Sequence, residues 1–443
     1  MRAFLAQIER VNPLVNAIVT LRPASELLAE AENADRPLAA GEAPGALHGL
    51  PIAIKDLSLT RGIRTTFGSR IYRDFVPTSD ELYVERLRCA GAIVIGKTNT
   101  PEFGAGSQTF NAVFGATRNP YDLNKTCGGS SGGAAVALAC GMLPLADGTD
   151  LGGSLRNPAS FCNVVGFRPS PGRVPRLHAR AGDTLGVHGP MARNVEDLAL
   201  LLAVMAGPDS RDPLSLPEPG ARFRIVSERD FAGVRLAWSE RLGRYPVEPD
   251  VTAVCNASRS VFTALGCEVE NGEPDLSGVD ELFQTLRAAG YAETLGRDLE
   301  RHRELLKDTV VWNVERGLAL TPNDLARAEA TKAALDARVT RFFSVYEFLV
   351  LPTVQVLPFA VETEWVRAIG AEPMHTYIDW MATCYAISCT GLPAISVPCG
   401  FSPEGLPVGL QIVGRRGRDL EVLELALAFE QATNHAQRRP PCV

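Results

Sequence analysis

One lysine and two serines have the types and settings needed for acyl-transfer chemistry. Lys55 follows a short apolar run, and Ser130 and Ser154 lie in two glycine-rich stretches, 128–133 (GGSSGG) and 148–156 (GTDLGGSLR). A nucleophilic serine needs a base, and none of the six histidines stands in a motif that would supply one. A lysine acting through a second serine can do this work. If the three side chains converge, we expect a hydrolase.

The lysine can act as a base only if its amine is neutral. A lysine with an ordinary pKa of about 10.4 is almost fully protonated at pH 7, and burial lowers that pKa. The run 51–54 (PIAI) suits a buried strand, which would carry Lys55 into the interior. Without the serine stretches, a surface lysine paired with Asp56 would be the better interpretation, because lysine is rarely buried.

The glycine-rich stretches favour a fixed active-site loop over a flexible linker. Residues 134–139 (AAVALA) directly follow the first stretch and predict a tightly packed helix. In the second stretch, residues 152–154 place several backbone N–H groups beside a hydroxyl. An oxyanion hole needs such donors around the point where negative charge develops.

Two other motifs fit the sequence poorly. Residues 91–98 (GAIVIGKT) satisfy the pattern of a P-loop, but the apolar residues between the glycines predict a strand, whose N–H groups belong to a sheet. A nucleotide-binding protein therefore remains only a minor alternative, which ATP binding would test. Residues 129–133 fit a nucleophile elbow, but a polar, turn-rich stretch precedes them where an elbow needs a strand.

The elements around these residues alternate between strand and helix. Such alternation predicts an α/β fold, a twisted, mostly parallel or mixed sheet covered on both faces by helices. An amphipathic helix is expected at the N-terminus, with Phe4, Leu5, Ile8 and Val11 on one face. Strands are expected at 52–54, 92–95, 234–238, 268–270, 348–352 and 394–397. Helices are expected at 80–90, 133–141, 194–207, 251–265 and over most of 279–347, with a surface loop at 208–222.

Composition limits the classes of function. The 443 residues are 46% hydrophobic and 21% charged, with a net charge of −7, which is typical of a globular protein and not of a nucleic-acid-binding one. No stretch is apolar enough to cross a membrane. The ten cysteines lack the spacing of zinc ligands, so we expect reduced, mostly buried thiols in a cytoplasmic protein.

These stretches resemble the amidase signature family. The resemblance is dense from Leu50 to about Ser170 and returns at 391–398 (GLPAISVP) and 405–411 (GLPVGLQ). The intervals of 75 residues from Lys55 to Ser130 and of 24 from Ser130 to Ser154 are also similar to the family's spacing. Residues 166–170 (GFRPS) vary a more usual GLKPT, and this departure does not touch the three residues.

The resemblance implies a role for each residue of the site. Ser154 would be the nucleophile, Ser130 the relay serine after a cis peptide bond, and Lys55 the terminal base. No metal and no organic cofactor is implied. The resemblance also implies oxyanion-hole and supporting residues at Leu151, Gly152, Gly153, Ser131, Asp150 and Arg156.

The expected function is hydrolysis of small, neutral amides at their C–N bond, with esters and carbamates (urethanes) sharing the same chemistry. The alternative is the glutaminase subunit of a transamidation complex, which needs partner subunits and a site for the charges of a free amino acid. We expect a single domain over 1–443, with a signature core at about 45–215, and the oligomeric state is open, a homodimer included. The substrate pocket is expected in the region of about 270–380, where four residues could give it an aromatic lining: Trp312, Trp365, Tyr377 and Trp380.

Overall fold

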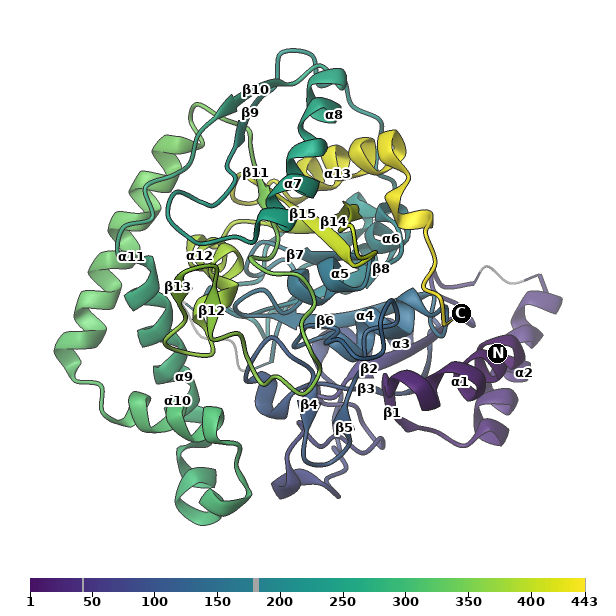
Figure 1. Ribbon diagram of the computed structural model, residues 1–443. Coiled ribbons are helices and arrows are strands. Elements are labelled where there is room, and N and C mark those ends of the chain that lie inside the picture. Colours follow the sequence, from purple (N-terminus) through teal and green to yellow (C-terminus); the bar gives the residue numbers. More distant parts are fainter. Residues whose placement is uncertain (42–43, 178–182, 443) are drawn as a thin grey trace.

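The computed structural model describes residues 1–41, 44–177 and 183–442. Figure 1 shows helices packed around central strands, with the long helices α9 and α11 along one edge. The α-helices are α1 (Arg2–Val15), α2 (Ala24–Ala39), α3 (Leu82–Cys89), α4 (Gly132–Ala139), α5 (Arg156–Phe161), α6 (Val195–Met205), α7 (Pro249–Ala257), α8 (Arg259–Ala264), α9 (Val279–His302), α10 (Asp308–Leu318), α11 (Pro322–Phe342), α12 (Ala382–Thr390) and α13 (Asp419–Thr433).

Most strands belong to one large sheet or to a smaller one beside it. The strands are β1 (Ile18–Leu21), β2 (Pro51–Lys55), β3 (Ile93–Thr98), β4 (Phe110–Asn111), β5 (Gly115–Ala116), β6 (Leu145–Asp150), β7 (Val165–Arg168), β8 (Val187–Ala192), β9 (Arg235–Trp238), β10 (Glu268–Asn271), β11 (Phe348–Pro352), β12 (Ala368–Ile369), β13 (Glu372–Pro373), β14 (Ala394–Phe401) and β15 (Pro407–Gly414). Short 3₁₀ helices occur at Arg70–Tyr72, Glu102–Gly104, Gly220–Phe223, Arg303–Leu305, Asp379–Met381 and His435–Gln437.

The large sheet has eight strands in the order β10-β9-β11-β15-β14-β7-β8-β6. Within the described residues, β9 pairs in parallel with β10 and β11, and every other neighbouring pair is antiparallel. Of the two arrangements predicted, the mixed α/β sheet is confirmed and the mostly parallel sheet is wrong. One physical reason is the short turn at 402–406, which joins β14 directly to β15 and so forces them to run in opposite directions.

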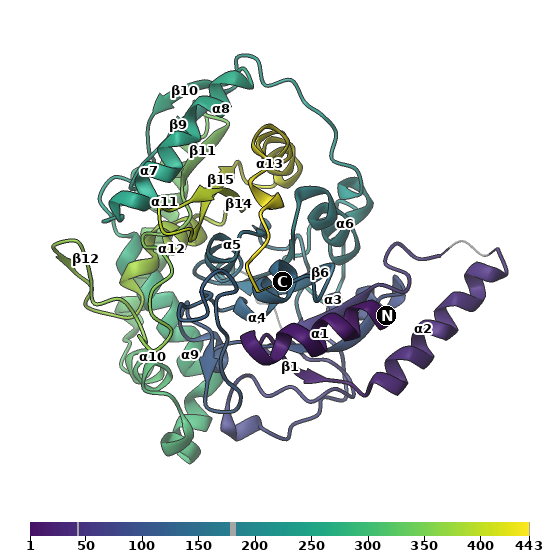
Figure 2. The same ribbon diagram turned by 45° about the vertical axis from the view of Figure 1, so that its right-hand side comes forward.

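Both faces of the large sheet are buried. Along β11, Leu349 and Leu351 point into one hydrophobic cluster, and Phe348 and Val350 point into the other. This alternation follows from the two-residue period of a strand. Helices α4, α5, α9 and α12 contribute to the first cluster, and α3, α6, α7 and α13 to the second. Figures 1 and 2 show these helices around the strands from two directions.

The smaller sheet has the order β1-β3-β2, and it carries the lysine at the end of β2. The apolar runs at 52–54 and 92–95 form strands as predicted, and β3 runs parallel to β2. The P-loop-like stretch therefore belongs to a strand. Its lysine, Lys97, is fully buried and donates to the carbonyl oxygen of Ser58 at 2.6 Å and to Thr60 Oγ1 at 2.7 Å.

Most of the predicted helices are confirmed. Every residue of α4 is buried, and Asn194 caps α6 by accepting from the Asp197 N–H at 2.7 Å. Ile8 and Val11 are buried on α1. The single helix expected at 251–265 is divided into α7 and α8 at Ser258.

Two expectations from composition can be compared with the structure. All ten cysteines are free thiols, and eight of them are buried. One of the six histidines that the sequence analysis considered as bases, His178, lies outside the described residues. Among the helices of the described ranges, none combines the length and the apolar character needed to span a bilayer.

Candidate active site

Lys55 ends strand β2 with its amine deep inside the protein. The residue has no solvent exposure, and its Nζ lies within hydrogen-bond distance of three hydroxyls. Nζ is 2.8 Å from Ser130 Oγ, 2.9 Å from Ser131 Oγ and 2.8 Å from Thr149 Oγ1. The interpretation of Lys55 as a surface residue is therefore wrong, because β2 is buried along its whole length.

This environment favours the neutral amine. Burial lowers the pKa of Lys55 from its ordinary 10.5 to about 7, although Asp147 and Asp150 act in the opposite direction. An ammonium ion would donate to all three hydroxyls, whereas a neutral amine donates two hydrogen bonds and keeps a lone pair for the third. At pH 7 a substantial fraction of the protein thus holds a base in contact with serine hydroxyls.

Two residues of strand β6 that the sequence analysis did not single out position this lysine. Asp147 accepts a hydrogen bond from the Lys55 backbone N–H at 3.0 Å and another from the Tyr83 hydroxyl at 2.6 Å. Thr149 contacts the amine itself. The two residues are separated by one position, so they share a face of the strand, and that spacing was a usable signal.

Ser130 and Ser154 come from the two glycine-rich stretches and line the same cavity. The Gly129–Ser130 peptide bond is cis, as the resemblance implied. The Ser131 N–H donates to the Ser154 carbonyl oxygen at 3.1 Å, which ties the stretches together. Both serines line the cavity, but no hydrogen bond joins their hydroxyls within the described structure.

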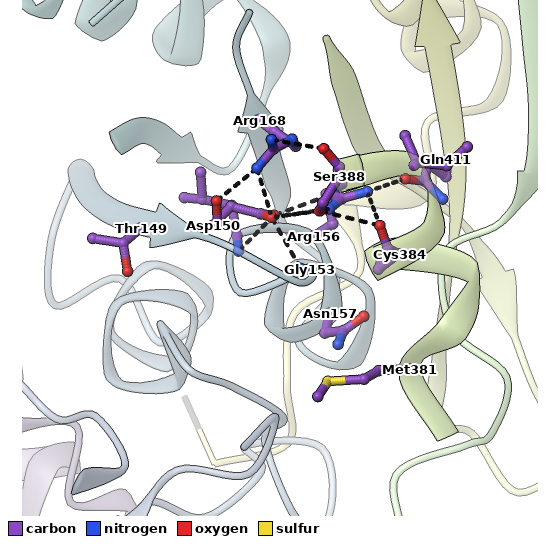
Figure 3. A network of polar contacts seen from close by, with 12 residues as sticks. Thr149, Asp150, Gly153, Arg156, Asn157, Arg168, Met381, Cys384, Ser388 and Gln411 are labelled. Atoms are coloured by element: carbon purple, nitrogen blue, oxygen red, sulfur yellow. Dashed lines mark hydrogen bonds and ion pairs between the residues drawn. The ribbon is translucent and has the colours of Figure 1, made fainter. Parts of the chain in front are cut away.

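Asp150 organises the second stretch through a buried network of charges (Figure 3). Its carboxylate binds Arg156 through Nε at 3.0 Å and Nη2 at 2.9 Å, and Arg168 Nη1 at 3.3 Å. Burial alone would favour the neutral acid, but the two arginines outweigh it and hold the pKa of Asp150 below its ordinary value. Arg156 also donates to Ser388 Oγ at 2.7 Å and to Gln411 Oε1.

The same carboxylate determines which backbone N–H groups are free. The Gly153 N–H donates to Asp150 Oδ1 at 2.9 Å, so it is already engaged in this structure. No acceptor among the described residues is recorded for the N–H groups of Leu151 and Gly152. Gly153 has φ +115°, and a Cβ atom there would come within 2.5 Å of the Cys384 side chain, so only glycine fits.

The cavity beside the serines has a volume of about 200 Å³. The region 270–380 lines the cavity as expected, but the four aromatic residues chosen from it are wrong: Trp365, Tyr377 and Trp380 surround a separate, much smaller cavity, and Trp312 packs against the core. The side chains that line the cavity from α9 are instead Arg287 and Tyr291. The other lining residues are Leu57, Phe103, Gly104, Ser130, Thr149, Asp150, Leu151, Ser154, Arg176, Gly186, Val187 and His188.

The described part of the chain contains no evident binding site for a metal ion. No group of three or more His, Cys, Asp and Glu side chains there could hold a metal ion. His188 lies beside the serines, but burial, together with Arg176 and Lys55, lowers the pKa of its imidazole to about 3. The ring therefore stays neutral at pH 7.

Comparison with known proteins identifies the family to which this fold belongs. Residues 1–423 match the Amidase family. The chain is 37% identical to an acylamidase of Rhodococcus erythropolis, over 99% of this chain and 92% of that protein. It is 36% identical to one of the subunits of the glutamyl-tRNA(Gln) amidotransferase of Symbiobacterium thermophilum, over 98% of this chain and 93% of that one.

The solved structure of a bacterial aryl acylamidase of the amidase signature family superposes with a TM-score of 0.92 at 28% identity, covering 98% of this chain and 93% of that chain. The shared architecture defines a hydrolase with an α/β fold. More narrowly, the chain belongs to the amidase signature family, and it is a hydrolase of amide C–N bonds.

Proposed function

We propose that the protein cleaves small amides through an acyl-enzyme on Ser154, with Ser130 as relay and Lys55 as terminal base. The observation that carries this proposal is the buried Lys55 amine, whose pKa is lowered to about 7 and which contacts Ser130 Oγ at 2.8 Å. A base near neutrality and a nucleophile at the same cavity are the two requirements of covalent acyl transfer.

Acylation proceeds in a defined order. Ser154 Oγ attacks the amide carbonyl carbon while its proton passes to Ser130, whose own proton passes to Lys55. The hydroxyls of Ser130 and Ser154 must approach each other as substrate binds, a tightening that is common when catalytic hydrogen bonds are loose without substrate. The carbonyl π electrons move to oxygen, which gives a tetrahedral oxyanion.

The oxyanion is held by backbone donors of the second glycine-rich stretch. The N–H groups of Leu151 and Gly152 are the best candidates, since that of Gly153 binds Asp150. Collapse of the intermediate breaks the C–N bond, and Ser130 returns a proton to the leaving amine while Lys55 reprotonates Ser130. Water then attacks the acyl-enzyme by the same route and releases the acid and free Ser154.

Esters and carbamates fit the same steps. Both pass through a tetrahedral oxyanion, and an alkoxide leaves more readily than an amide anion. We therefore extend the proposal to ester and urethane hydrolysis, for which the cavity of about 200 Å³ beside Ser154 has room for a small acyl group.

The glutaminase subunit of a transamidation complex is the second candidate, favoured by the 36% identity to a component of an amidotransferase. Only one of the two charges of free glutamine finds a partner in the cavity. Arg287 lines the cavity and can hold the carboxylate of glutamine. Its ammonium group has no such partner, because the only carboxylate among the described lining residues, Asp150, is bound to Arg156 and Arg168. Copurifying partner subunits would favour this candidate.

A panel of substrates tests both candidates. An aryl amide, an ester, a carbamate and glutamine are each incubated with the wild type and with the Ser154→Ala variant. We expect the isolated chain to cleave the first three and not glutamine, and we expect the variant to cleave none of them. Turnover of glutamine alone would favour the glutaminase, and full activity of the variant would overturn the assignment of the nucleophile.

A further inference from the structure

Arg287 is a buried cation in the wall of the cavity beside Ser154. It lies on α9, is 5% exposed and lines the cavity together with Ser130 and Ser154. Its Nε and Nη2 donate to the Tyr377 hydroxyl at 3.1 and 2.7 Å, and Nη2 also donates to the Tyr291 hydroxyl at 3.3 Å. No oxygen of the described residues is recorded as accepting from its Nη1.

The charge of this arginine has no counter-ion among the described residues. No carboxylate of the described residues forms an ion pair with it, and its polar partners are two phenols. A buried charge without an opposite charge is costly, so such groups are normally paired. Tyrosine rings also surround it, with the guanidinium carbon 4.8 Å from the ring centre of Tyr291 and 5.6 Å from that of Tyr377.

The other charged groups that line the cavity are already neutralised or uncharged. Arg176 pairs with Asp183 at 3.1 Å, and Asp150 is bound to two arginines. His188 is neutral at pH 7 because its pKa is lowered to about 3. Arg287 is thus the one cation among the described lining residues that lacks an anionic partner.

We propose that Arg287 binds a carboxylate of the substrate, so that this hydrolase prefers amides or carbamates that carry an anionic group at the end opposite the scissile bond. This inference rests on the proposed function of Ser154. The N–H groups of Nη1 can donate charge-assisted hydrogen bonds to a carboxylate, and the phenols of Tyr291 and Tyr377, which accept from Nε and Nη2, fix the orientation of the guanidinium. Such a preference would replace the expectation of a neutral substrate.

The rest of the cavity suits an apolar segment between the two ends of such a substrate. Leu57, Phe103, Leu151 and Val187 contribute apolar side chains to the same wall. Phe103 is held next to Arg287, because the Tyr291 hydroxyl donates to its carbonyl oxygen at 3.1 Å. A short chain of methylene groups with a carboxylate at its end would find both apolar side chains and a cation in this cavity.

Two 4-nitroanilides of equal length test the preference. The pentanoyl compound ends in a methyl group, and the glutaryl compound carries a carboxylate in its place. We expect the wild type to show a kcat/KM roughly 10- to 100-fold higher for the glutaryl compound, because hydrogen bonds to charged groups are worth about this much. Arg287→Gln should lose most of this preference through KM, whereas Arg287→Lys, which keeps the charge, should retain part of it.

The pentanoyl compound is the internal control in each variant. A loss of equal size for both substrates in Arg287→Gln would indicate a structural role and overturn the proposal, as would equal kcat/KM values in the wild type. If both compounds are cleaved only when Ser154 is present, but without preference, the proposed function stands and this inference fails.

A binding measurement serves where turnover is slow or a variant folds poorly. Calorimetry with the glutaryl anilide compares the Ser154→Ala protein with the same protein carrying Arg287→Lys, and pentanoyl anilide is the control. We expect the glutaryl compound to bind at least about 10-fold more tightly than the control, and high salt to reduce the difference. Equal affinities of the two compounds would also overturn the proposal.

Discussion

The two sides of the cavity are built in different ways. On the side formed by the glycine-rich stretches, one short segment supplies several groups: residues 147–156 contribute Thr149, Asp150 and Ser154, and a carboxylate from the same segment holds its backbone. Lys55 joins this segment from β2. The opposite side, along α9, depends on side chains far apart in sequence. Arg287 is held there by Tyr377, 90 residues further along the chain.

This contrast separates chemistry from recognition. Catalytic groups must keep their geometry, which favours short segments with glycines and buried hydrogen bonds. Groups that select the substrate need only reach the cavity, and a helix such as α9 can present them without any fixed motif. The first side should therefore carry the reaction itself, and the second its preference among substrates.

The largest effect is expected at the local side. Ser154→Ala removes the nucleophile and should lower kcat at least about 10⁴-fold, as measured by release of an aryl amine. Ser258→Ala is the matched control, because Ser258 is also buried but lies between α7 and α8. Comparable losses in the two variants would mean that damage to folding, not loss of the nucleophile, explains the effect.

A loss of about 10²–10⁴-fold is expected when Lys55→Met removes the base. In the wild type, kcat/KM should fall tenfold per pH unit below about 7 and level off above it, because protonation occupies the lone pair of the amine. Lys97→Gln is the control: burial lowers the pKa of this second lysine to about 8, and its amine binds Ser58 and Thr60 instead.

The outcome that contradicts the role of Lys55 is a flat profile between pH 5.5 and 8.5 in protein whose melting temperature stays constant over that range. If the midpoint of the pH profile moves in Lys97→Gln but stays near 7 in other variants, the titrating group is Lys97 and not Lys55.

The buried network should matter more for stability than an exposed one of similar composition. Asp150→Asn leaves Arg156 and Arg168 buried without a charge partner and should lower the free energy of unfolding by about 3–5 kcal/mol, measured by urea denaturation. Asp336→Asn makes the same change next to Lys332 and Arg416, where the side chain is 34% exposed. There the loss should stay below about 1 kcal/mol. Equal losses in the free energy of unfolding for Asp150→Asn and Asp336→Asn would contradict the expected difference between the buried and the exposed network.

The smallest effect is expected on the recognition side. Tyr377→Phe keeps Arg287 but removes the hydroxyl that accepts two of its hydrogen bonds. We expect KM for the glutaryl anilide to rise roughly 3- to 10-fold with little change in kcat, because the guanidinium loses its orientation. Tyr245→Phe, which removes a hydroxyl bound to Asp280, should leave KM unchanged. A drop in kcat alone would place Tyr377 with the catalytic groups instead.

Much of the local side was predictable from the sequence. The strand ending at Lys55, the buried helix after Ser131 and the glycine at 153 follow from apolar runs and glycine spacing. Asp147 could have been found from its position on the same strand face as Thr149. The resemblance added the cis bond before Ser130, which no periodicity indicates.

The distant contacts were not predictable in this way. Arg168 was visible only as a departure from a familiar stretch, yet it binds Asp150 at 3.3 Å. The aromatic residues chosen for the cavity lie elsewhere, because a side chain's type does not say which face of a helix or loop meets the cavity. Arg287 gave no signal, since an arginine on a charged helix is usually exposed.

The sequence by itself determined the types of catalytic group and the local backbone that carries them, because glycine spacing and apolar runs act over a few residues. Only the tertiary structure decided that Lys55 is dehydrated enough to be a base and that Arg287 finds no counter-ion in the part of the chain that the structure describes. Both are properties of burial, and burial depends on which distant segments pack together.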